Sequence, residues 1–411
     1  MQLKDGNSKC AIGAALSAAT CMLLGTAPVR AEESDGGKPW RVDAGAMYYT
    51  EDDRIDVRSY VTEVRRRIGE DEFVTAKGIY DSITGSSPTG ATYAQTYTSA
   101  SGSAPMGSFE ETRKAVAAGW ERPVTDLTRM SLGVNHSRSD TYESSGGSAV
   151  FSTDFHQRNT TVTYGIGYAR DSNQPNGGVP EPLDAVGSAD IIKSAGIKRQ
   201  MDLQLGVTQV IGRGTLAQVN YVRSNAKGYL TNPYKVVSIV HPLTGETLNF
   251  ATLHEKRPDD RRSNALLGQL NHQFGVGVGY ATYRYYWDDW DVRAHNLELK
   301  YRFPMTEYMY LQAHVRGYRQ TAAEFYEPMV LSNQGLKYVS ADYRLNESQT
   351  FSTGLKLGYH TVEWGEFTIR YEYMRQTGEE HPSGTVGVQH EAELFPDLTA
   401  YIVHIGYTVN F

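Results

Sequence analysis

The chain has 411 residues, a formal net charge of −7 and a mean hydropathy of −0.47. This polarity excludes a bundle of membrane-spanning helices, because no stretch after residue 30 approaches the ~20 apolar residues that one spanning helix requires. The acidic balance argues against nucleic acid as a partner. Aromatic residues make up 11% of the chain and 28 of them are tyrosines, which is typical of β-strands and of the aromatic girdles of membrane barrels.

Residues 1–31 have the pattern of a secretory signal peptide. Lys4 and Lys9 give a positive start, a mostly apolar stretch follows, and Ala31 ends a small-residue cleavage site. A membrane anchor is the alternative, but the apolar run is shorter than a span. Both cysteines lie in this segment, so the exported chain would hold no disulfide, thiolate metal site or covalently attached haem. We therefore expect export, a short N-terminal segment at 32–40, and one domain at 41–411.

From 41 onward the chain repeats segments of ten to fourteen residues in which apolar and polar side chains alternate. In 293–303, for example, Leu297 and Leu299 alternate with Glu298 and Lys300. A period of two indicates a β-strand with one apolar and one polar face. A soluble β-sandwich and a membrane barrel share this alternation, so the period alone does not separate them.

The connections between these segments separate the two architectures. Short turns, such as the one at Arg122-Pro123, alternate with long loops rich in Gly, Ser and Pro. The long loops are 82–107, 171–197, 227–261, 321–347 and 378–397. Short periplasmic turns and long external loops are typical of bacterial outer-membrane proteins. The sequence therefore predicts an all-β fold, a transmembrane antiparallel β-barrel in the outer membrane.

The same alternation predicts the number of strands. Both ends of such a barrel lie in the periplasm, so the number is even. We expect about sixteen, with fourteen or eighteen as alternatives, at 41–50, 55–67, 72–81, 108–120, 127–139, 147–157, 159–170, 198–211, 214–226, 262–274, 277–288, 293–303, 308–320, 348–360, 366–377 and 398–411.

The last segment carries a second signal. Its alternate residues are apolar or aromatic and end in a phenylalanine: Tyr401, Val403, Ile405, Tyr407, Val409 and Phe411. A final amphipathic strand of this kind resembles the signal that the bacterial barrel-assembly machinery reads. The expected partners are therefore this machinery and the lipid of the outer membrane.

Two acidic clusters lie where we expect external hairpin tips. They are Glu51, Asp52 and Asp53, and Asp288, Asp289 and Asp291. Clustered carboxylates can bind Ca²⁺, which takes six to eight oxygen ligands. Neither cluster has the spacing of a defined Ca²⁺ loop, so we favour solvated tips over a metal site.

Charged side chains on the polar faces of the strands form the second group of candidates. We expect these residues to line the lumen: Arg284, Glu298, Lys300, Arg302, His314, Arg316, Lys356, Arg370 and Glu372. Their mixed signs allow cross-strand ion pairs that hold the wall together. They equally allow a selectivity zone for a charged solute.

Catalytic patterns are weak, and we predict no enzyme and no cofactor. The tripeptide Asn135-His136-Ser137 suggests a phospholipase, but adjacent residues of a strand point to opposite faces. His136 and Ser137 therefore cannot form a nucleophile–base pair.

Six motifs give the chain a family resemblance: MYYTEDDR at 47–54, YDSITG at 80–85, GYLTNPYK at 228–235, EKRPD at 255–259, YRYYWDDW at 283–290 and AEFY at 323–326. They resemble an uncharacterised family of bacterial outer-membrane barrels, domain of unknown function 3570. Ser86, Ser87 and Asn232 depart from the commoner choices in this family. The resemblance implies no reaction, but it implies a role near extracytoplasmic redox chemistry, beside a periplasmic lipoprotein or a thioredoxin-like or flavin-linked partner.

Three hypotheses follow. The first is a channel or transport barrel of unknown substrate, because about sixteen strands leave an aqueous interior. The second is a scaffold barrel for a redox partner, which rests on the family resemblance. The third, an outer-membrane hydrolase, is disfavoured by the missing catalytic geometry. A receptor with a plug domain is also disfavoured, because the alternation begins by Arg41.

Overall fold

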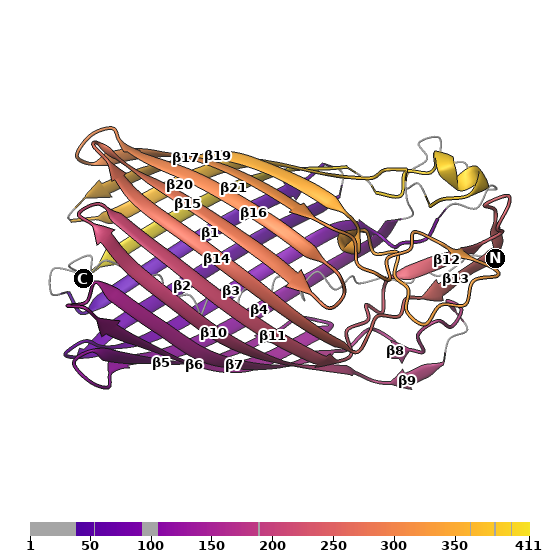
Figure 1. Cartoon of the computed structure of the whole chain (residues 1–411), viewed down its shortest axis with the longest axis horizontal. Helices are drawn as coiled ribbons and strands as arrows, with labels where there is room; N and C mark the ends of the chain where they lie inside the picture. Colours follow the sequence, from indigo (N-terminus) through magenta and orange to yellow (C-terminus); the bar gives the residue numbers. More distant parts are fainter. Residues whose placement is uncertain are drawn as a thin grey trace.

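The computed structural model describes residues 38–411, apart from 53, 93–105, 188–189, 362, 382–383 and 396. The expected signal peptide at 1–31 and most of the segment at 32–40 lie outside the described residues. The described chain forms one closed barrel of sixteen tilted antiparallel strands (Figure 1). The expected fold class is confirmed, and sixteen is the correct number of strands.

Each predicted strand corresponds to one strand of the barrel. In their order around the ring these are β1 (Trp40–Glu51), β2 (Ile55–Gly69), β3 (Glu72–Pro88), β4 (Met106–Pro123), β5 (Thr128–Arg138), β6 (Tyr142–Phe155), β7 (Thr160–Asn173), β10 (Gly196–Gly212), β11 (Thr215–Gly228), β14 (Asp260–Phe274), β15 (Gly277–Asp288), β16 (Arg293–Pro304), β17 (Met309–Gln320), β19 (Ser348–Thr361), β20 (Gly365–Gly378) and β21 (Leu398–Asn410).

The remaining elements lie in the long loops. A three-stranded sheet has the order β13 (Thr247–His254), β12 (Val236–Val240), β18 (Val330–Leu331), and β8 (Val179–Pro180) pairs with β9 (Ile191–Lys193). The loops also hold two short 3₁₀ helices, η1 (Tyr343–Leu345) and η2 (Gly387–Glu391). No helix among the described residues has the length and hydropathy of a membrane span.

The barrel closes where its first and last strands meet. β1 pairs with β21 from Arg41 opposite Asn410 to Glu51 opposite Ala400. At the end of this seam the backbones of Trp40 and Phe411 exchange hydrogen bonds of 3.0 and 2.9 Å, and their rings stack with centroids 6.4 Å apart. The predicted assembly-signal residues at 401–411 therefore form the closing strand, and Phe411 packs on the strand that begins the barrel.

Large apolar side chains cover the outside of the barrel. Ile166, Leu203, Val219, Leu297 and Leu355 expose between 46% and 54% of their surface. They occupy the alternate strand positions that point away from the lumen. In water such a continuous belt would drive association, whereas in a bilayer it contacts lipid chains. The exterior is therefore that of a membrane barrel.

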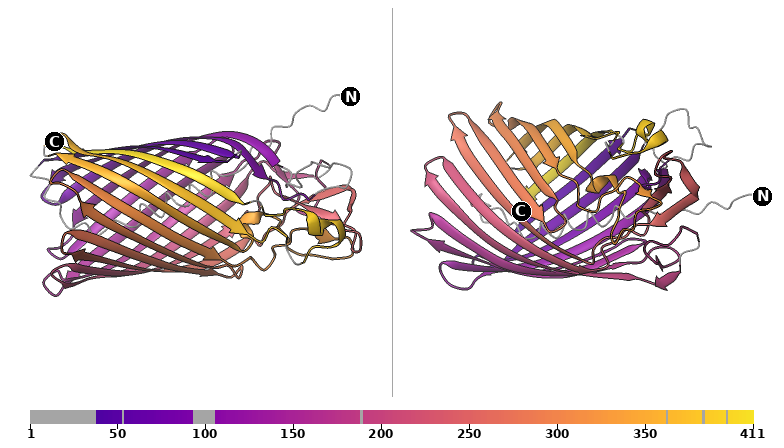
Figure 2. Two further views of the ribbon diagram at one scale, coloured as in Figure 1. Left: turned by 90° about the horizontal axis from the view of Figure 1, so that it is seen from above. Right: turned by 45° about the vertical axis from the view of Figure 1, so that its right-hand side comes forward.

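The five long loops leave the same end of the barrel, at the right of Figures 1 and 2. The C-terminus lies at the opposite end (Figure 1), together with Trp40, whose backbone is hydrogen-bonded to Phe411. We call the end with the long loops the extracellular end, as in other outer-membrane barrels. The predicted assignment of 321–347 to one external loop is confirmed, because β17 and β19 pair directly on either side of it.

A matched pair of substitutions tests which face meets lipid. Leu203 lies near the middle of β10 and is 46% exposed, and Gln204 beside it points into the lumen. We expect Leu203→Arg to lower the free energy of unfolding in lipid vesicles by ~2–4 kcal/mol, because it places a charge in the hydrocarbon. Gln204→Arg should change it far less. Urea unfolding of both variants measures the difference, and equal effects would contradict the assigned orientation.

Candidate functional site: the lumen and the extracellular loop cap

All nine candidate lumen residues occupy the inward positions of β15, β16, β17, β19 and β20. Their sequence neighbours Tyr283, Leu297, Leu299, Val315 and Leu355 are among the exposed apolar residues of the exterior. Since successive side chains of a strand point to opposite faces, the charged neighbours face the lumen. The structure brings the nine residues into three groups along this wall.

The first group is centred on His314. Its Nε2 atom lies 2.9 Å from a carboxylate oxygen of Glu298, and its Nδ1 atom lies 3.6 Å from one of Glu372. Lys300 approaches Glu298 to 2.9 Å, and Arg370 approaches Glu372 to 3.8 Å. The imidazole therefore lies between two carboxylates, each of which also has a cationic neighbour.

A glycine permits this contact across an intervening strand. Gly354 of β19 lies between His314 and Glu372 in the hydrogen-bonded register. A Cβ atom added at Gly354 would lie 2.6 Å from the carbonyl oxygen of Tyr371 and 3.1 Å from the Cα of Glu372. Without a side chain at this position, His314 and Glu372 meet over the backbone of β19, and the wall is cross-linked through three strands.

The second group surrounds Tyr310, nearer the periplasmic end. The guanidinium of Arg302 lies over the Tyr310 ring at 3.6 Å, and Lys356 lies 5.5 Å from the same ring. The Tyr310 hydroxyl donates to Glu366 at 2.5 Å, and Lys356 is 4.0 Å from that carboxylate. Cation–π contacts and one carboxylate therefore hold two cations side by side.

The third group lies nearer the extracellular end. In the strand register, Arg284 of β15 and Tyr318 of β17 both lie opposite Asn296 of β16, and Arg316 lies two residues before Tyr318. Arg316 donates from Nε to the Asn296 side chain at 2.7 Å. Although it points inward, Arg316 remains exposed, so water reaches this part of the lumen.

The long loops bind one another into what we call the loop cap: the described parts of loops 89–105, 174–195, 229–259, 321–347 and 379–397. Loop 229–259 contacts each of the other four through backbone atoms. Its residues Val236, His254, Ile239 and Thr244 pair respectively with Thr89, Leu183, Val330 and Val388. Figure 2 shows the cap gathered beyond the ends of the barrel strands. Loop 229–259 is thus the hub of the cap.

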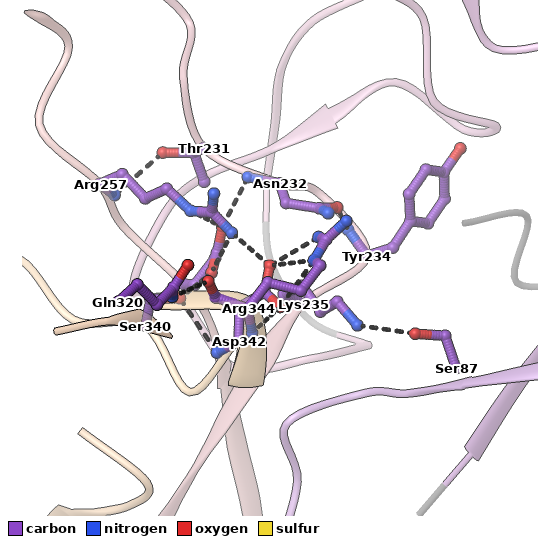
Figure 3. A network of polar contacts seen from close by, with 11 residues as sticks. Ser87, Thr231, Asn232, Tyr234, Lys235, Arg257, Gln320, Ser340, Asp342 and Arg344 are labelled. Atoms are coloured by element: carbon purple, nitrogen blue, oxygen red, sulfur yellow. Dashed lines mark hydrogen bonds and ion pairs between the residues drawn. The ribbon is translucent and has the colours of Figure 1, made fainter. Parts of the chain in front are cut away.

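A network of charged side chains joins the hub to loop 321–347, and we call it the cap cluster: Lys235, Glu255, Arg257, Asp342 and Arg344. Figure 3 shows Lys235, Arg257, Asp342 and Arg344 of this network. Glu255 and Asp342 are almost completely buried. Arg257 bridges them, at 2.6 Å from Glu255 and 2.8 Å from Asp342. Arg344 binds Asp342 at 2.6 Å from the other side. Cations and carboxylates thus alternate through the network.

Neutral groups complete the cap cluster. The Ser340 hydroxyl donates to Glu255, and the backbone N–H of Asn232 donates to the same carboxylate at 2.6 Å. Lys235, buried to 1% exposure, donates from Nζ to Ser87 at 3.3 Å. The cluster therefore connects loop 229–259 with loop 321–347 and with the extracellular end of β3.

The ionisation of the cluster follows from its charges. Burial alone would raise the pKa of the Asp342 carboxyl, but Arg344, Lys235 and Arg257 outweigh burial and hold that pKa well below its usual range. Burial acts to lower the pKa of Arg257, and Glu255 and Asp342 reverse this and raise it. Asp342 and Arg257 therefore carry full charges at neutral pH.

The two acidic tips differ from the solvated tips that the sequence suggested. Asp288 is inaccessible, since its carboxylate accepts from Arg261 at 2.5 Å and from the backbone of Trp290 and Val292 at 3.0 and 2.9 Å. The solvated interpretation is therefore wrong for Asp288. Here the carboxylate closes the hairpin turn that follows β15.

At the other tip, the interpretation as a solvated carboxylate is also wrong for Glu51. It is buried, accepts from the Tyr49 hydroxyl at 2.7 Å and lies 3.5 Å from Arg54. Asp52 is exposed, and Asp53 lies outside the described residues. In the second tip, Asp289 and Asp291 bind Arg262 and Arg293 at 2.9 and 3.2 Å. Within the described part of the chain, no three His, Cys, Asp or Glu side chains are arranged to hold a metal ion.

His136 and Ser137 do not form a nucleophile–base pair, because they lie on opposite faces of β5. His136 is exposed on the outer face, and Ser137 beside it is buried on the inner face. His136 instead contacts Ser145 of the neighbouring strand at 2.9 Å. A similar pair joins Thr215 and His272 at 2.7 Å, so such contacts recur as cross-strand polar pairs.

The cap cluster itself was absent from our sequence candidates. Its residues lie in segments that the sequence marks as loops, and the EKRPD motif at 255–259 was the available signal. That motif concentrates charges beside a proline. It does not reveal that Arg257 meets Asp342, which lies 85 residues further along the chain.

The closed barrel, its apolar exterior and its polar lumen define the class of the protein as an outer-membrane β-barrel. The chain belongs to the family described as "Protein of unknown function (DUF3570)", whose model matches residues 13–409. The resemblance seen in the sequence is therefore confirmed. A comparison with curated proteins gives no match.

Solved structures with a similar architecture are bacterial barrels. A double mutant of the ferric enterobactin receptor PfeA of Pseudomonas aeruginosa has 11% identity and a TM-score of 0.44, over 87% of this chain and 57% of that one. The siderophore receptor PirA of P. aeruginosa has 10% identity and a TM-score of 0.42, over 82% and 56%. OccK2 (OpdF) of P. aeruginosa has 9% identity and a TM-score of 0.41, over 92% and 98%. The chain thus spans little more than half of the two receptors, and the likeness concerns architecture alone.

Removing one charge from the cap cluster should loosen the loop cap. Asp342→Asn leaves Arg257 and Arg344 without their shared carboxylate, which costs about 3–5 kcal/mol when a buried pair is broken. We expect faster cleavage of the loops by protease added outside liposomes that contain the protein. The matched control is Asp291→Asn, because Asp291 and Arg293 are both more than 60% exposed and such pairs contribute little. Equal cleavage of both variants would contradict the role of the cluster.

His254 should make the loop cap sensitive to pH. Burial lowers the pKa of His254 below its usual value of 6.5, against the opposing effects of the Pro233 backbone and Asp184. The open loop therefore binds a proton more readily than the closed one, and this stabilising contribution is lost as pH falls below about 6.5 towards the folded pKa. We expect faster hydrogen exchange in 236–240 and 252–254 as pH decreases from 7 to 5, after correction for intrinsic rates. His254→Gln should remove this dependence, and an unchanged profile would refute it.

Proposed function

We propose that this protein is a transport barrel of the outer membrane, a channel that its loop cap gates. The observation that carries this proposal is the hydrated, charged interior. Lys356 and Arg370 point into the lumen and keep 31% and 30% of their side-chain surface accessible, and Arg316 is more exposed. A barrel interior filled by packed side chains would bury such groups or neutralise them.

The opposite side of the lumen supports the proposal. In a ring of sixteen strands, β5, β6 and β7 lie across from β17, β19 and β20. Midway along these strands the inward residues are small, as with Gly133, Gly146, Ser148, Gly165 and Gly167. Asn135 and Val150 lie over Gly146 and Gly165, but no large side chain projects from these small residues towards the opposite wall, as a pathway for solutes requires.

The loop cap supplies the gate. Its loops are tied to the hub at 229–259 by backbone pairs and by the cap cluster, so the extracellular mouth has a defined cover. The redox-scaffold hypothesis has no comparable support, since no contact in the described chain favours it. A channel with a cover is therefore the function that the geometry supports best.

Planar-bilayer recordings test this function. The purified protein should produce discrete current steps. Asp342→Asn should increase the fraction of time spent open at an unchanged step size, because it loosens the cap without changing lumen residues. Asp291→Asn serves as the control, and heat-modifiable migration on gels verifies that each barrel is folded. Folded barrels that give no current, including the Asp342→Asn variant, would exclude a channel.

A further inference from the structure

We propose that the lumen prefers anions and that Arg284 and Arg316 form its binding position for a small oxyanion such as a carboxylate. This inference rests on the proposed channel function, because it names the class of solute that the channel admits. The inference depends on which inward-facing cations of β14 to β20 are paired with a carboxylate and which can still bind a solute.

We call the inward face of β14 to β20 the basic wall, and most of its cations have an acidic neighbour. Arg261, Lys300, Lys356 and Arg370 approach Asp288, Glu298, Glu366 and Glu372 to 2.5, 2.9, 4.0 and 3.8 Å, respectively. These four carboxylates are the inward-facing acids of β14 to β20. They are therefore already used by the cations beside them.

Three arginines of the same wall remain. Within the residues that the structure describes, Arg284, Arg302 and Arg316 have no carboxylate within 4.0 Å. Arg302 is covered by the Tyr310 ring at 3.6 Å. Arg316 uses Nε for Asn296 and leaves its terminal nitrogens to the lumen, where it is exposed. The wall thus carries an excess of positive charge that water reaches.

Arg284 and Arg316 are suited to hold an anion together. Arg284 and Tyr318 lie on either side of Asn296 in the strand register, and Asn296 accepts from Nε of Arg316 at 2.7 Å. The Tyr318 hydroxyl donates to Gln320 at 2.7 Å. The guanidinium of Arg284 makes no hydrogen bond to the described residues. A guanidinium presents its donors in a planar fork that matches a carboxylate in bidentate geometry. Two such forks side by side suit a small oxyanion.

The remaining lumen acids do not offer cations an equivalent position. Glu111, Asp154 and Asp202 have no cation within 4.0 Å among the described residues, but each already accepts hydrogen bonds. Thr141 donates to Glu111 at 3.1 Å, Thr161 to Asp154 at 2.7 Å, and Ser224 to Asp202 at 2.5 Å. Glu111 is 1% exposed and so is withdrawn from the lumen. An entering anion therefore finds two guanidinium groups side by side, whereas Asp154 and Asp202 are single carboxylates on separate parts of the wall.

The small residues of β5 to β7 strengthen this preference. They carry no charge across from β17, which holds Arg316, although the Asp202 carboxylate lies beside Gly167. Charges of one sign in a cleft with low-dielectric walls raise the local concentration of the opposite ion. Rings or rows of Arg and Lys select anions in pores by this effect.

Reversal potentials in a tenfold gradient of KCl, and then of potassium acetate, test the inference. We expect the wild-type channel to favour chloride and acetate over potassium, and Arg284→Gln combined with Arg316→Gln to reduce this ratio several-fold towards unity. Arg284→Lys with Arg316→Lys keeps both charges and should retain the chloride preference while losing more of the acetate preference, because lysine cannot bind a carboxylate in a bidentate manner.

The matched control removes the same charge from the outside of the barrel. Arg199 and Arg223 lie exposed at outward positions of β10 and β11, and their double substitution by Gln should leave both ratios unchanged. A conducting wild-type protein that prefers potassium, or a preference that survives the Arg284→Gln, Arg316→Gln change, would overturn the inference alone. The absence of current in every folded variant would overturn the channel function together with it.

Discussion

The pairing of β1 with β21 is the constraint on which the rest of the structure depends. Hydrocarbon offers no partner to a backbone N–H or C=O, so a sheet in the membrane must have no free edge. The eleven residues from Arg41 to Glu51 meet their partners on β21 and remove both edges. Once the ring is closed, its circumference sets the width of the lumen, and alternation sends every second side chain into it.

The closed ring also explains why the two kinds of polar cluster differ. In the lumen, side chains project from neighbouring strands that are already held in register. Ion pairs therefore form between residues on the same strand or on adjacent strands. In the loop cap, the loops pair through one small three-stranded sheet and through separate backbone hydrogen bonds. The buried cap cluster adds ionic contacts between loops 229–259 and 321–347, with Arg257 between Glu255 and Asp342. A buried network of this kind favours one arrangement of its segments when all members are satisfied.

Much of this fold could be predicted from the sequence because the relevant signals are local. Alternation within a strand depends only on that strand, so all sixteen strands and the inward position of residues such as Arg284 and Glu298 follow from it. The burial of the acidic residues at the hairpin tips was harder to predict. Asp288 reads as a solvent-exposed acid, yet backbone donors of its own turn and Arg261 of the neighbouring strand enclose it.

Contacts between distant segments could not be predicted in this way. His314 meets Glu372 only because the register places Gly354 between them, and register is a property of three strands together. Similarly, no local pattern states that Lys235, Arg257 and Asp342 share one site. The polar, charged lining of the lumen could therefore be predicted. The contacts between its side chains, and the existence of the cap cluster, could not.

The parallel pairing of β12 with β18 has a consequence for the order of folding. These strands belong to different loops, and Ile239 lies opposite Val330 although four barrel strands separate them along the chain. Closing so long a segment is entropically unfavourable until something else brings its ends together. The intervening strands β14 to β17 do so when they insert side by side. The cover of the mouth should thus be the last part of the molecule to form, so that the membrane-embedded wall serves as the template on which its own lid is assembled.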